Sequence, residues 1–222
     1  MTPVQSQLVA GASAEHGQPV PPSTLLEALL PRDSGVARTA AMVAAVVLGT
    51  ALLTLSAKIN VPVWPVPVTL QTFAVAALAA TFGARLAVAT VMAYLLQGAA
   101  GLPVFATGGG IGYLVGPTGG FLAGTLLMAY IIGRAADAGA TRKPLLLLGA
   151  MIVGDAGLFV AGFGWLLAFG SSAAWLDQSN LVGSAFAGAV QPFIVWDLLK
   201  MGLAALTASG LLSLAQLWIR RS

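Results

Sequence analysis

Two side chains of opposite charge stand three residues apart in the apolar stretch PFIVWDLLKMGL (192–203). Residues three apart on a helix share a face, so the Asp197 carboxylate and the Lys200 ammonium should lie side by side. Such a pair suits a polar, uncharged ligand group that has both N–H donors and a carbonyl acceptor. The alternative is that the two charges only neutralise each other. Because ionisable residues inside an apolar span are by default functional, we expect ligand contact.

A second acid, Asp155, lies about halfway along the apolar segment 144–170, with no cation at helical spacing. Its carboxyl group is either protonated, hydrogen-bonded to another helix, or directed into the same cavity as Asp197. A proton relay is a further hypothesis, because acids within membrane spans serve as relays in transporters. Asp155 is therefore a candidate site residue.

The segment VFATGGGIGYLVGPTGGFLAG (104–124) is rich in glycine, which permits irregular backbone close to a ligand. It is no dinucleotide fingerprint, because Val115 stands where the third glycine belongs, and the chain has no G-K-[ST] phosphate loop. Four of the glycines recur every four residues, as small residues do where membrane helices cross closely: Gly112, Gly116, Gly120 and Gly124. We expect the later glycines to pack helices and the earlier ones, including Gly109 and Gly110, to form a lid.

The stretch VPVWPVPVTLQT (61–72) joins three prolines and Trp64 in a stiff loop before a helix. A tryptophan at this place is typical of an anchor at the membrane interface. The alternative is that Trp64 covers an apolar ring of a ligand while Gln71 supplies a polar contact, since ligand sites combine apolar walls with few polar groups. Both residues are candidate ligand contacts.

The composition indicates a membrane protein. Of 222 residues, 58% are hydrophobic and only 8% are charged, whereas soluble domains carry about a quarter charged residues. The excess apolar surface must face lipid, so the chain is a polytopic membrane protein. It has no cysteine, and its one histidine, His16, lies in a polar tail, so we expect no catalytic residue, no metal site and no enzyme. The basic residues are spread singly, which argues against nucleic acid as a partner.

Apolar segments separated by Pro, Gly or charge predict an all-α bundle of six transmembrane helices, at roughly 38–57, 69–84, 86–102, 118–135, 144–170 and 190–218. The second and third are shorter than the about 20 residues that span a bilayer, so they should be tilted, distorted or shielded. Residues 37–222 form the membrane domain and residues 1–36 a tail. In the tail, Thr24 and Glu27 have capping-box spacing, which predicts a short helix at the membrane surface, with a disordered tail as the alternative.

The basic residues also predict the orientation. Six spans put both termini on one side, and the opposite side holds only Lys58 among the loop cations. The positive-inside rule then places both termini in the cytoplasm, in a multi-pass protein of the inner cell membrane, with Asp197 and Lys200 reachable from outside. The cations on the side of the termini are Arg32, Arg38, Arg85, Arg134, Arg142, Lys143, Arg220 and Arg221.

In the first helix, Ala41 and Ala45 form a small-xxx-small stripe. Such a stripe favours close helix contact, either within the bundle or with a partner. Besides membrane lipid, the candidate partners therefore include a second copy of this chain or another membrane subunit.

Three strings, VPVWPVPVTLQTFAV, QGAAGLPVFATGGGIGYLVGPTGGFLAG and WDLLKMGLAAL, resemble the BioY family of biotin transporters over roughly residues 38–215. These are the substrate-binding S components of energy-coupling factor (ECF) transporters. The resemblance implies a six-helix S-component fold with the vitamin bound near the outer face, under the loops between helices one and two and helices three and four. It implies that the D-x-x-K of the last helix, here Asp197 and Lys200, holds the ureido head of biotin. It also implies that Ala41 and Ala45 contact the transmembrane coupling subunit.

The resemblance suggests contacts for the rest of biotin as well. The thiophane ring would lie against aromatic and aliphatic walls. The valerate carboxylate needs a donor, for which Tyr113 and the backbone N–H groups of the glycine-rich loop, such as Gly109 and Gly110, are candidates. Family members can carry Asn in the loop occupied here by residues 106–108, where Thr107 is the substitute candidate. Biotin is then the transported substrate, and no cofactor is expected.

The sequence contains no nucleotide-binding motif, so ATP-driven transport would require ATPase and coupling subunits on other chains. The alternative function is a stand-alone, ion-coupled secondary transporter of biotin or a similar small vitamin. In that mechanism Asp155 or Asp197 would carry the proton.

Overall fold

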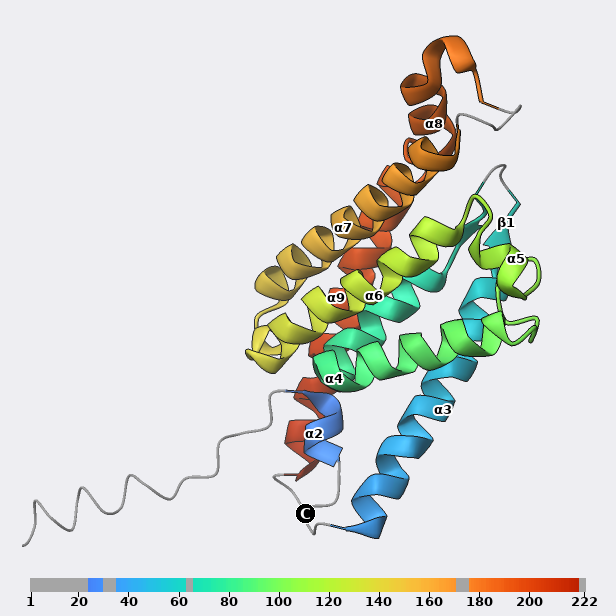
Figure 1. Cartoon of the computed structure of the whole chain (residues 1–222). Coiled ribbons are helices and arrows are strands. Elements are labelled where there is room, and N and C mark those ends of the chain that lie inside the picture. The colour runs from blue at the N-terminus through green and yellow to red at the C-terminus, as the bar shows by residue number, and fades with distance from the viewer. Residues whose placement is uncertain (1–23, 30–34, 63–65, 171–175, 220–222) are drawn as a thin grey trace, which may run out of the picture.

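The computed structural model describes residues 24–29, 35–62, 66–170 and 176–219, which are mostly helical (Figure 1). The long helices are α3 (Val36–Lys58), α4 (Gln71–Ala99), α6 (Gly119–Asp137), α7 (Pro144–Gly170) and α9 (Ile194–Ile219). Shorter elements connect them: α2 (Leu25–Leu29), β1 (Asn60–Val61), β2 (Val68–Thr69), α5 (Ile111–Leu114), η2 (Ala140–Arg142), η3 (Gln178–Asn180) and α8 (Leu181–Ala189). Among the described residues, five helical stretches are long and apolar enough to cross a membrane.

Helix α4 contains two of the six expected segments. Gly83 within it has φ 77° and ψ 171°, so α4 is two helices joined by a sharp break. Glycine adopts a positive φ without a Cβ penalty. The freed backbone groups find side-chain partners: Ala84 N–H donates to Asp137 Oδ2 at 3.2 Å, and Thr141 Oγ1 donates to the Ala80 carbonyl oxygen at 3.2 Å. The two halves correspond to the short second and third segments, which confirms the six-helix bundle.

The helices pass back and forth between two ends of the molecule (Figure 1). The end that holds α2 also holds the start of α3 and the end of α9, while α5, α8 and the β1–β2 pair lie at the opposite end. Helix α4 packs against α3, α6 and α9. Helix α6 packs against both α4 and α7. Its buried side chains, including Met128 and Ile132, form much of the core together with Met151 of α7.

The contact between α6 and α7 accounts for part of the glycine repeat. A Cβ atom on Gly120 would overlap Trp165, and one on Gly124 would overlap the backbone of Leu158. These glycines permit close helix packing, as expected for the later members of the repeat. Gly112, in α5, has no such neighbour within 4 Å, so the packing interpretation does not extend to it.

The short helix predicted near the end of the tail is α2. Thr24 Oγ1 accepts the backbone N–H of Glu27 at 3.2 Å, which is the expected N-terminal cap. Helix α2 packs against α4 and α9 at one end of the bundle. Residues 1–23 and 30–34 lie outside the described residues.

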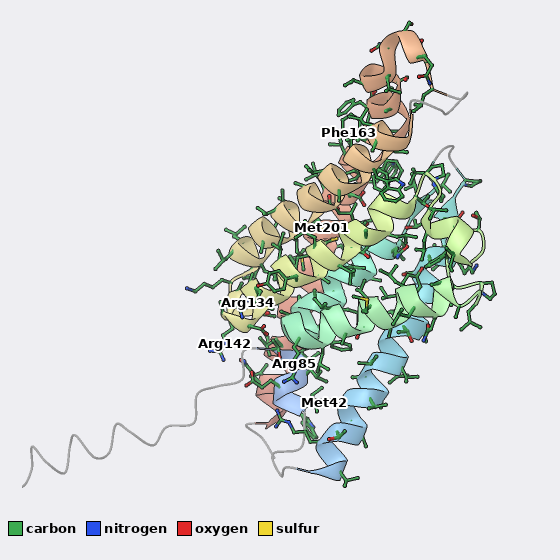
Figure 2. All side chains as sticks on the ribbon, in the orientation of Figure 1. Met42, Arg85, Arg134, Arg142, Phe163 and Met201 are labelled. Atoms are coloured by element: carbon green, nitrogen blue, oxygen red, sulfur yellow. The ribbon has the colours of Figure 1, made fainter. Side chains whose placement is uncertain are left out.

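Most of the described cations lie at the end of the bundle near α2. Figure 2 shows Arg85, Arg134 and Arg142 there, whereas Phe163 lies toward α8 at the opposite end. Lys58, the last residue of α3, is also at that opposite end. Three further cations of the expected basic side lie outside the described residues: Arg32, Arg220 and Arg221.

Candidate functional site

A cavity lies between the beginnings of α4, α6 and α9, the segment before α6, and the middle of α7. It contains about 590 Å³ of space, counting its open mouth. Its polar lining residues are Thr69, Gln71, Thr72, Tyr113, Thr118, Thr125, Asp197 and Lys200, and its apolar ones include Phe105, Phe121, Leu122, Leu158, Phe159 and Phe193.

Asp197 and Lys200 form an ion pair at the polar end of this cavity. Asp197 lies in the first turn of α9, where the helix dipole favours a negative charge, and Lys200 Nζ is 2.5 Å from Asp197 Oδ1. The ammonium also donates to the Thr69 carbonyl oxygen at 2.8 Å and to Thr72 Oγ1 at 3.3 Å. The Thr72 hydroxyl in turn donates to Asp197 Oδ1 at 2.7 Å. The expected pair is therefore part of a network that joins α9 to the start of α4.

Two buried polar atoms of the lining have no hydrogen-bond partner among the described residues. They are Asp197 Oδ2, an acceptor, and Gln71 Nε2, a donor. The exposed fraction is 1% for Asp197 and 8% for Gln71. Buried polar groups are nearly always paired, because an unpaired one costs about 1–3 kcal/mol. Unpaired groups that line one cavity indicate a ligand that supplies both partners.

The remaining walls are aromatic and aliphatic. Phe159 of α7 makes edge-to-face contacts with Phe121 and Phe193, with ring centroids 6.1 Å and 5.9 Å apart. On the loop side, Phe105 stacks on Tyr113 with a centroid distance of 5.0 Å. Such rings favour contact with an apolar ring or chain. The cavity thus suits an amphipathic ligand with a polar head and an apolar body.

Two local contacts hold the polar end and the loop side in place. Strands β1 and β2 pair antiparallel, with Asn60 opposite Thr69, and so connect the end of α3 to the start of α4. This pairing sets the Thr69 carbonyl oxygen against Lys200. On the loop side, Lys58 Nζ donates to the Phe105 carbonyl oxygen at 2.6 Å. Lys58, which we expected to be the only loop cation on this side of the membrane, therefore supports a wall of the cavity.

Only some of the residues proposed to bind a ligand carboxylate line the cavity. Tyr113 lines it, and Thr107 Oγ1 donates to the Tyr113 hydroxyl at 3.5 Å. Thr107, Gly109 and Gly110 are not among the described residues that line it. The Gly110 N–H donates to the Gly98 carbonyl oxygen at 2.6 Å, so this backbone donor is already used.

Two other candidates are not among the described residues of the lining. Asp155 is buried in α7, and its Oδ1 has no hydrogen-bond partner among the described residues, but it is not one of the residues that line the cavity. Trp64 lies outside the described residues. The structure thus brings together Gln71, Tyr113, Asp197 and Lys200 from the sequence-predicted set.

The stripe expected on α3 has an orientation that the sequence did not indicate. Ala45 is buried and Ala41 is half-buried, whereas the preceding residues Ala40 and Ala44 are exposed with the same spacing. The exposed pair lines a shallow depression along α3 with Val43, Val47 and Leu48.

Sequence reasoning missed Thr72 and the aromatic residues of α6, α7 and the turn before α9. Thr72 follows Gln71 at the start of an apolar segment, and this pair of polar residues was the available signal. Its partner Asp197 lies 125 residues further along the chain, so only the packing of α4 against α9 shows the contact.

Comparisons with known proteins agree with this architecture. Residues 29–216 match the BioY family. The chain is 39% identical over 160 residues to the biotin transporter BioY of Thermotoga maritima, covering 72% of this chain and 88% of that protein. It is 33% identical over 170 residues to the probable biotin transporter BioY of Pyrococcus horikoshii, covering 76% and 94%. The crystal structure of the S-component for biotin from an ECF-type ABC transporter has a TM-score of 0.68 and 21% identity, covering 81% of this chain and 94% of that chain. That likeness shows a shared fold.

Proposed function

Because the chain belongs to the BioY family, we propose that it binds biotin and takes it up across the cell membrane as the substrate-specific S component of an ECF-type transporter. The names of its relatives give the substrate, and the fold is that of an S component for biotin. The observation that carries the proposal is the cavity with an unpaired, buried Asp197 Oδ2 at its polar end.

The cavity matches the parts of biotin one by one. The ureido ring offers two N–H donors and one carbonyl acceptor, which suit the polar end around Asp197. The thiophane ring would lie against the apolar wall that Phe159 and Phe193 form. The Tyr113 hydroxyl is the lining group we propose for the valerate carboxylate, with Thr107 beside it.

Titration of the purified protein with biotin, and with biotin whose carboxylate is converted to an amide, tests this assignment. Biotin should bind with one site per chain, and the amide should bind more weakly if a donor such as Tyr113 holds the carboxylate. Absence of saturable biotin binding by folded protein would refute the function. Tyr113→Phe provides the matched variant, since it removes only the hydroxyl and should abolish the difference between the two compounds.

We further propose that α3 carries the surface for the transmembrane coupling subunit. Small residues permit close approach of helices within a membrane. Ala41 and Ala45 were the expected contacts, but the exposure of Ala40 and Ala44 favours a surface one residue earlier along the helix. The energy for transport would then come from ATPase subunits on other chains, reached through this coupling subunit. A second copy of the chain is the other candidate partner for this face.

The second candidate function is ion-coupled transport without ATPases. It is supported by Asp155, whose buried Oδ1 has no hydrogen-bond partner among the described residues. Uptake of labelled biotin into vesicles that contain only this chain, with and without an imposed proton gradient, separates the two functions. Uptake that follows the gradient and is lost in Asp155→Asn supports ion coupling. Uptake only when ATPase and coupling subunits are added supports the S-component function.

A further inference from the structure

A groove lies at the end of the bundle near α2, opposite the ligand cavity. It opens between α2, α3 and the region of the Gly83 break in α4, and it contains about 1390 Å³ of space, counting its open side. Figure 2 shows Met42 and Arg85, two of its lining residues, at this end. The described linings of this α3–α4 groove and of the ligand cavity have no residue in common, so the groove is a separate feature.

Most of the groove wall is apolar. Arg38 and Val47 mark its two ends along α3, and they are about 14 Å apart at 1.5 Å per residue. One leaflet of a bilayer has about 15 Å of hydrocarbon, which is half of the about 30 Å core. The wall is therefore long enough to follow an acyl chain through one leaflet. Its apolar residues are Met42, Val43, Val46 and Val47 of α3 and Phe82 and Leu86 of α4.

Two arginines lie at the polar end of the groove. Arg38 is in the first turn of α3, and Arg85 is in the first turn after the break at Gly83. Both side chains are exposed, and neither guanidinium has an ion pair or a hydrogen bond among the described residues. The first turn of a helix carries partial positive charge, so it favours an anion and disfavours a cation. Two cations without counter-ions at two helix starts therefore favour an anionic ligand.

Two acids also line the groove, Glu27 of α2 and Asp137 of α6. Asp137 Oδ2 accepts the backbone N–H of Ala84 at 3.2 Å and so caps the second half of α4. Glu27 is also engaged within the protein. The negative charges of both residues weaken the attraction for an anion, so charge alone should not hold a small ion here. A ligand must also fill the apolar wall, which favours a lipid over free phosphate.

We propose that the α3–α4 groove binds one anionic phospholipid, with Arg38 and Arg85 holding its phosphate and the apolar wall holding an acyl chain. Arginine presents a planar fork of donors that matches the oxygens of a phosphate group. Basic pockets between membrane helices bind anionic lipid head groups on the cytoplasmic side, which is the predicted location of this end. The lipid site does not depend on which substrate the protein transports.

The neighbouring face of α3 has a different character. The depression proposed for the coupling subunit contains the small residues Ala40 and Ala44, and no charged residue is among its described lining. The groove contains arginines instead, and it borders that depression along Val43 and Val47. The charges thus favour a lipid in the groove, while the small residues favour a protein helix in the depression. A lipid in the groove would lie beside the docked subunit.

The test offers the purified full chain an equimolar mixture of phosphatidylglycerol and phosphatidylcholine with identical acyl chains. Native mass spectrometry then counts the lipids that the protein retains. The variants are Arg38→Gln, Arg85→Gln and the double change. The matched control is Arg134→Gln, which removes an exposed cation at the same end of the bundle but outside the described lining of the groove.

The unaltered protein and Arg134→Gln should retain one phosphatidylglycerol, preferred over phosphatidylcholine by about twenty-fold. Each single change should lower this preference about five-fold, and the double change should abolish it, because each arginine contributes separately to the attraction. Phosphatidylglycerol should also raise the melting temperature of the unaltered protein and of Arg134→Gln, but not that of the double variant. A preference that falls equally in Arg134→Gln would overturn the proposal, since it would reflect only the overall charge of this end.

The acyl part of the proposal is tested by filling the groove. Val47 and its neighbour Leu48 are both exposed on α3, but only Val47 lines the groove. Val47→Trp should therefore lower retention of phosphatidylglycerol about tenfold or more, whereas Leu48→Trp should leave it unchanged. Equal retention by these two variants would overturn the proposal.

Two further outcomes identify other occupants. Excess glycerol phosphate, which lacks acyl chains, should not displace phosphatidylglycerol. Displacement would overturn the proposal and assign the groove to a small soluble phosphate. An unaltered chain that retains no phosphatidylglycerol would also overturn it, and cross-links from position 38 to a co-purified coupling subunit would then identify a protein as the occupant. Biotin titration of the same samples tests the proposed function separately, because none of the altered residues lines the ligand cavity.

Discussion

Thr72 Oγ1, at the start of α4, donates a 2.7 Å hydrogen bond to Asp197 Oδ1 in the first turn of α9. The same hydroxyl accepts from Lys200 Nζ at 3.3 Å. Thr72→Val keeps the shape of the side chain and removes both contacts. Hydrogen bonds to charged groups contribute about 1.5–3 kcal/mol, so biotin affinity should fall roughly ten- to hundred-fold.

The matched control for that change is Thr207→Val on α9, where the exposed hydroxyl bonds only to its own helix, at the Leu203 carbonyl oxygen. Calorimetric titration of both variants with biotin checks the prediction. Equal affinities for the two variants would show that the Asp197 carboxylate is oriented without Thr72.

The ion pair itself can be tested by removing one charge and then both. Asp197→Asn and Lys200→Met should each weaken biotin binding by about ten- to hundred-fold. The first change removes the charge of the carboxylate, and the second removes the ammonium that holds this carboxylate in place. The double variant relieves the unpaired buried charge and should regain thermal stability. It should not regain affinity, since Asp197 Oδ2 is the proposed ligand acceptor. A double variant that binds biotin like the unaltered protein would show that the pair is only structural.

The distribution of cations predicts that both termini face the cytoplasm. Arg85, Arg134 and Arg142 share the end of the bundle near α2, and the positive-inside rule assigns that end to the cytoplasm. Fusions of a reporter that is active only in the cytoplasm should be active at either terminus and inactive when inserted at residue 180. Reporter activity at residue 180, with no activity at either terminus, would show that the topology is the reverse of the predicted one.

Residues 1–22 should be dispensable for binding. The segment is polar, and α2, the first described element after it, lies at the end of the bundle opposite the cavity. Deletion of residues 1–22 should leave the dissociation constant for biotin within a few-fold of the full chain. A folded truncation that no longer binds biotin would place the tail in the site.

Two pairs of bulky substitutions distinguish the coupling face of α3. Ala40→Leu with Ala44→Leu should weaken association with a coupling subunit while sparing biotin binding, because the change fills an exposed face. Ala41→Leu with Ala45→Leu should instead lower thermal stability, because Ala45 is buried within the bundle. Co-purification with the coupling subunit and thermal unfolding measure the two effects. Normal complex formation by the first pair would locate the interface elsewhere.

The features that could be predicted from the sequence depend on local spacing. Asp197 and Lys200 are three residues apart on one helix, so their pairing follows from helix geometry. A boundary at Arg85, two residues after Gly83, was also expected, because the charge interrupts the apolar run. The break itself, and its satisfaction by Asp137 and Thr141, required the structure.

What the sequence could not predict depends on contacts between distant segments. The hydrogen bonds of Lys200 go to Thr69 of β2 and Thr72 of α4, and no local pattern indicates that these segments meet α9 there. Likewise, two overlapping alanine pairs exist on α3, and only the neighbouring helices determine which one is exposed. Helical spacing fixes which residues share a face, but it does not fix what that face meets.

The hydrogen bond from Lys58 Nζ to the Phe105 carbonyl oxygen has a mechanical consequence. Helix α3 has 23 residues and is therefore about 34 Å long, with its exposed alanines near one end and Lys58 at the other. Phe105 in turn stacks on Tyr113 in the wall of the cavity. A subunit docked near Ala40 that tilts α3 would therefore move Lys58, whose hydrogen bond connects the far end of the helix directly to the wall of the cavity.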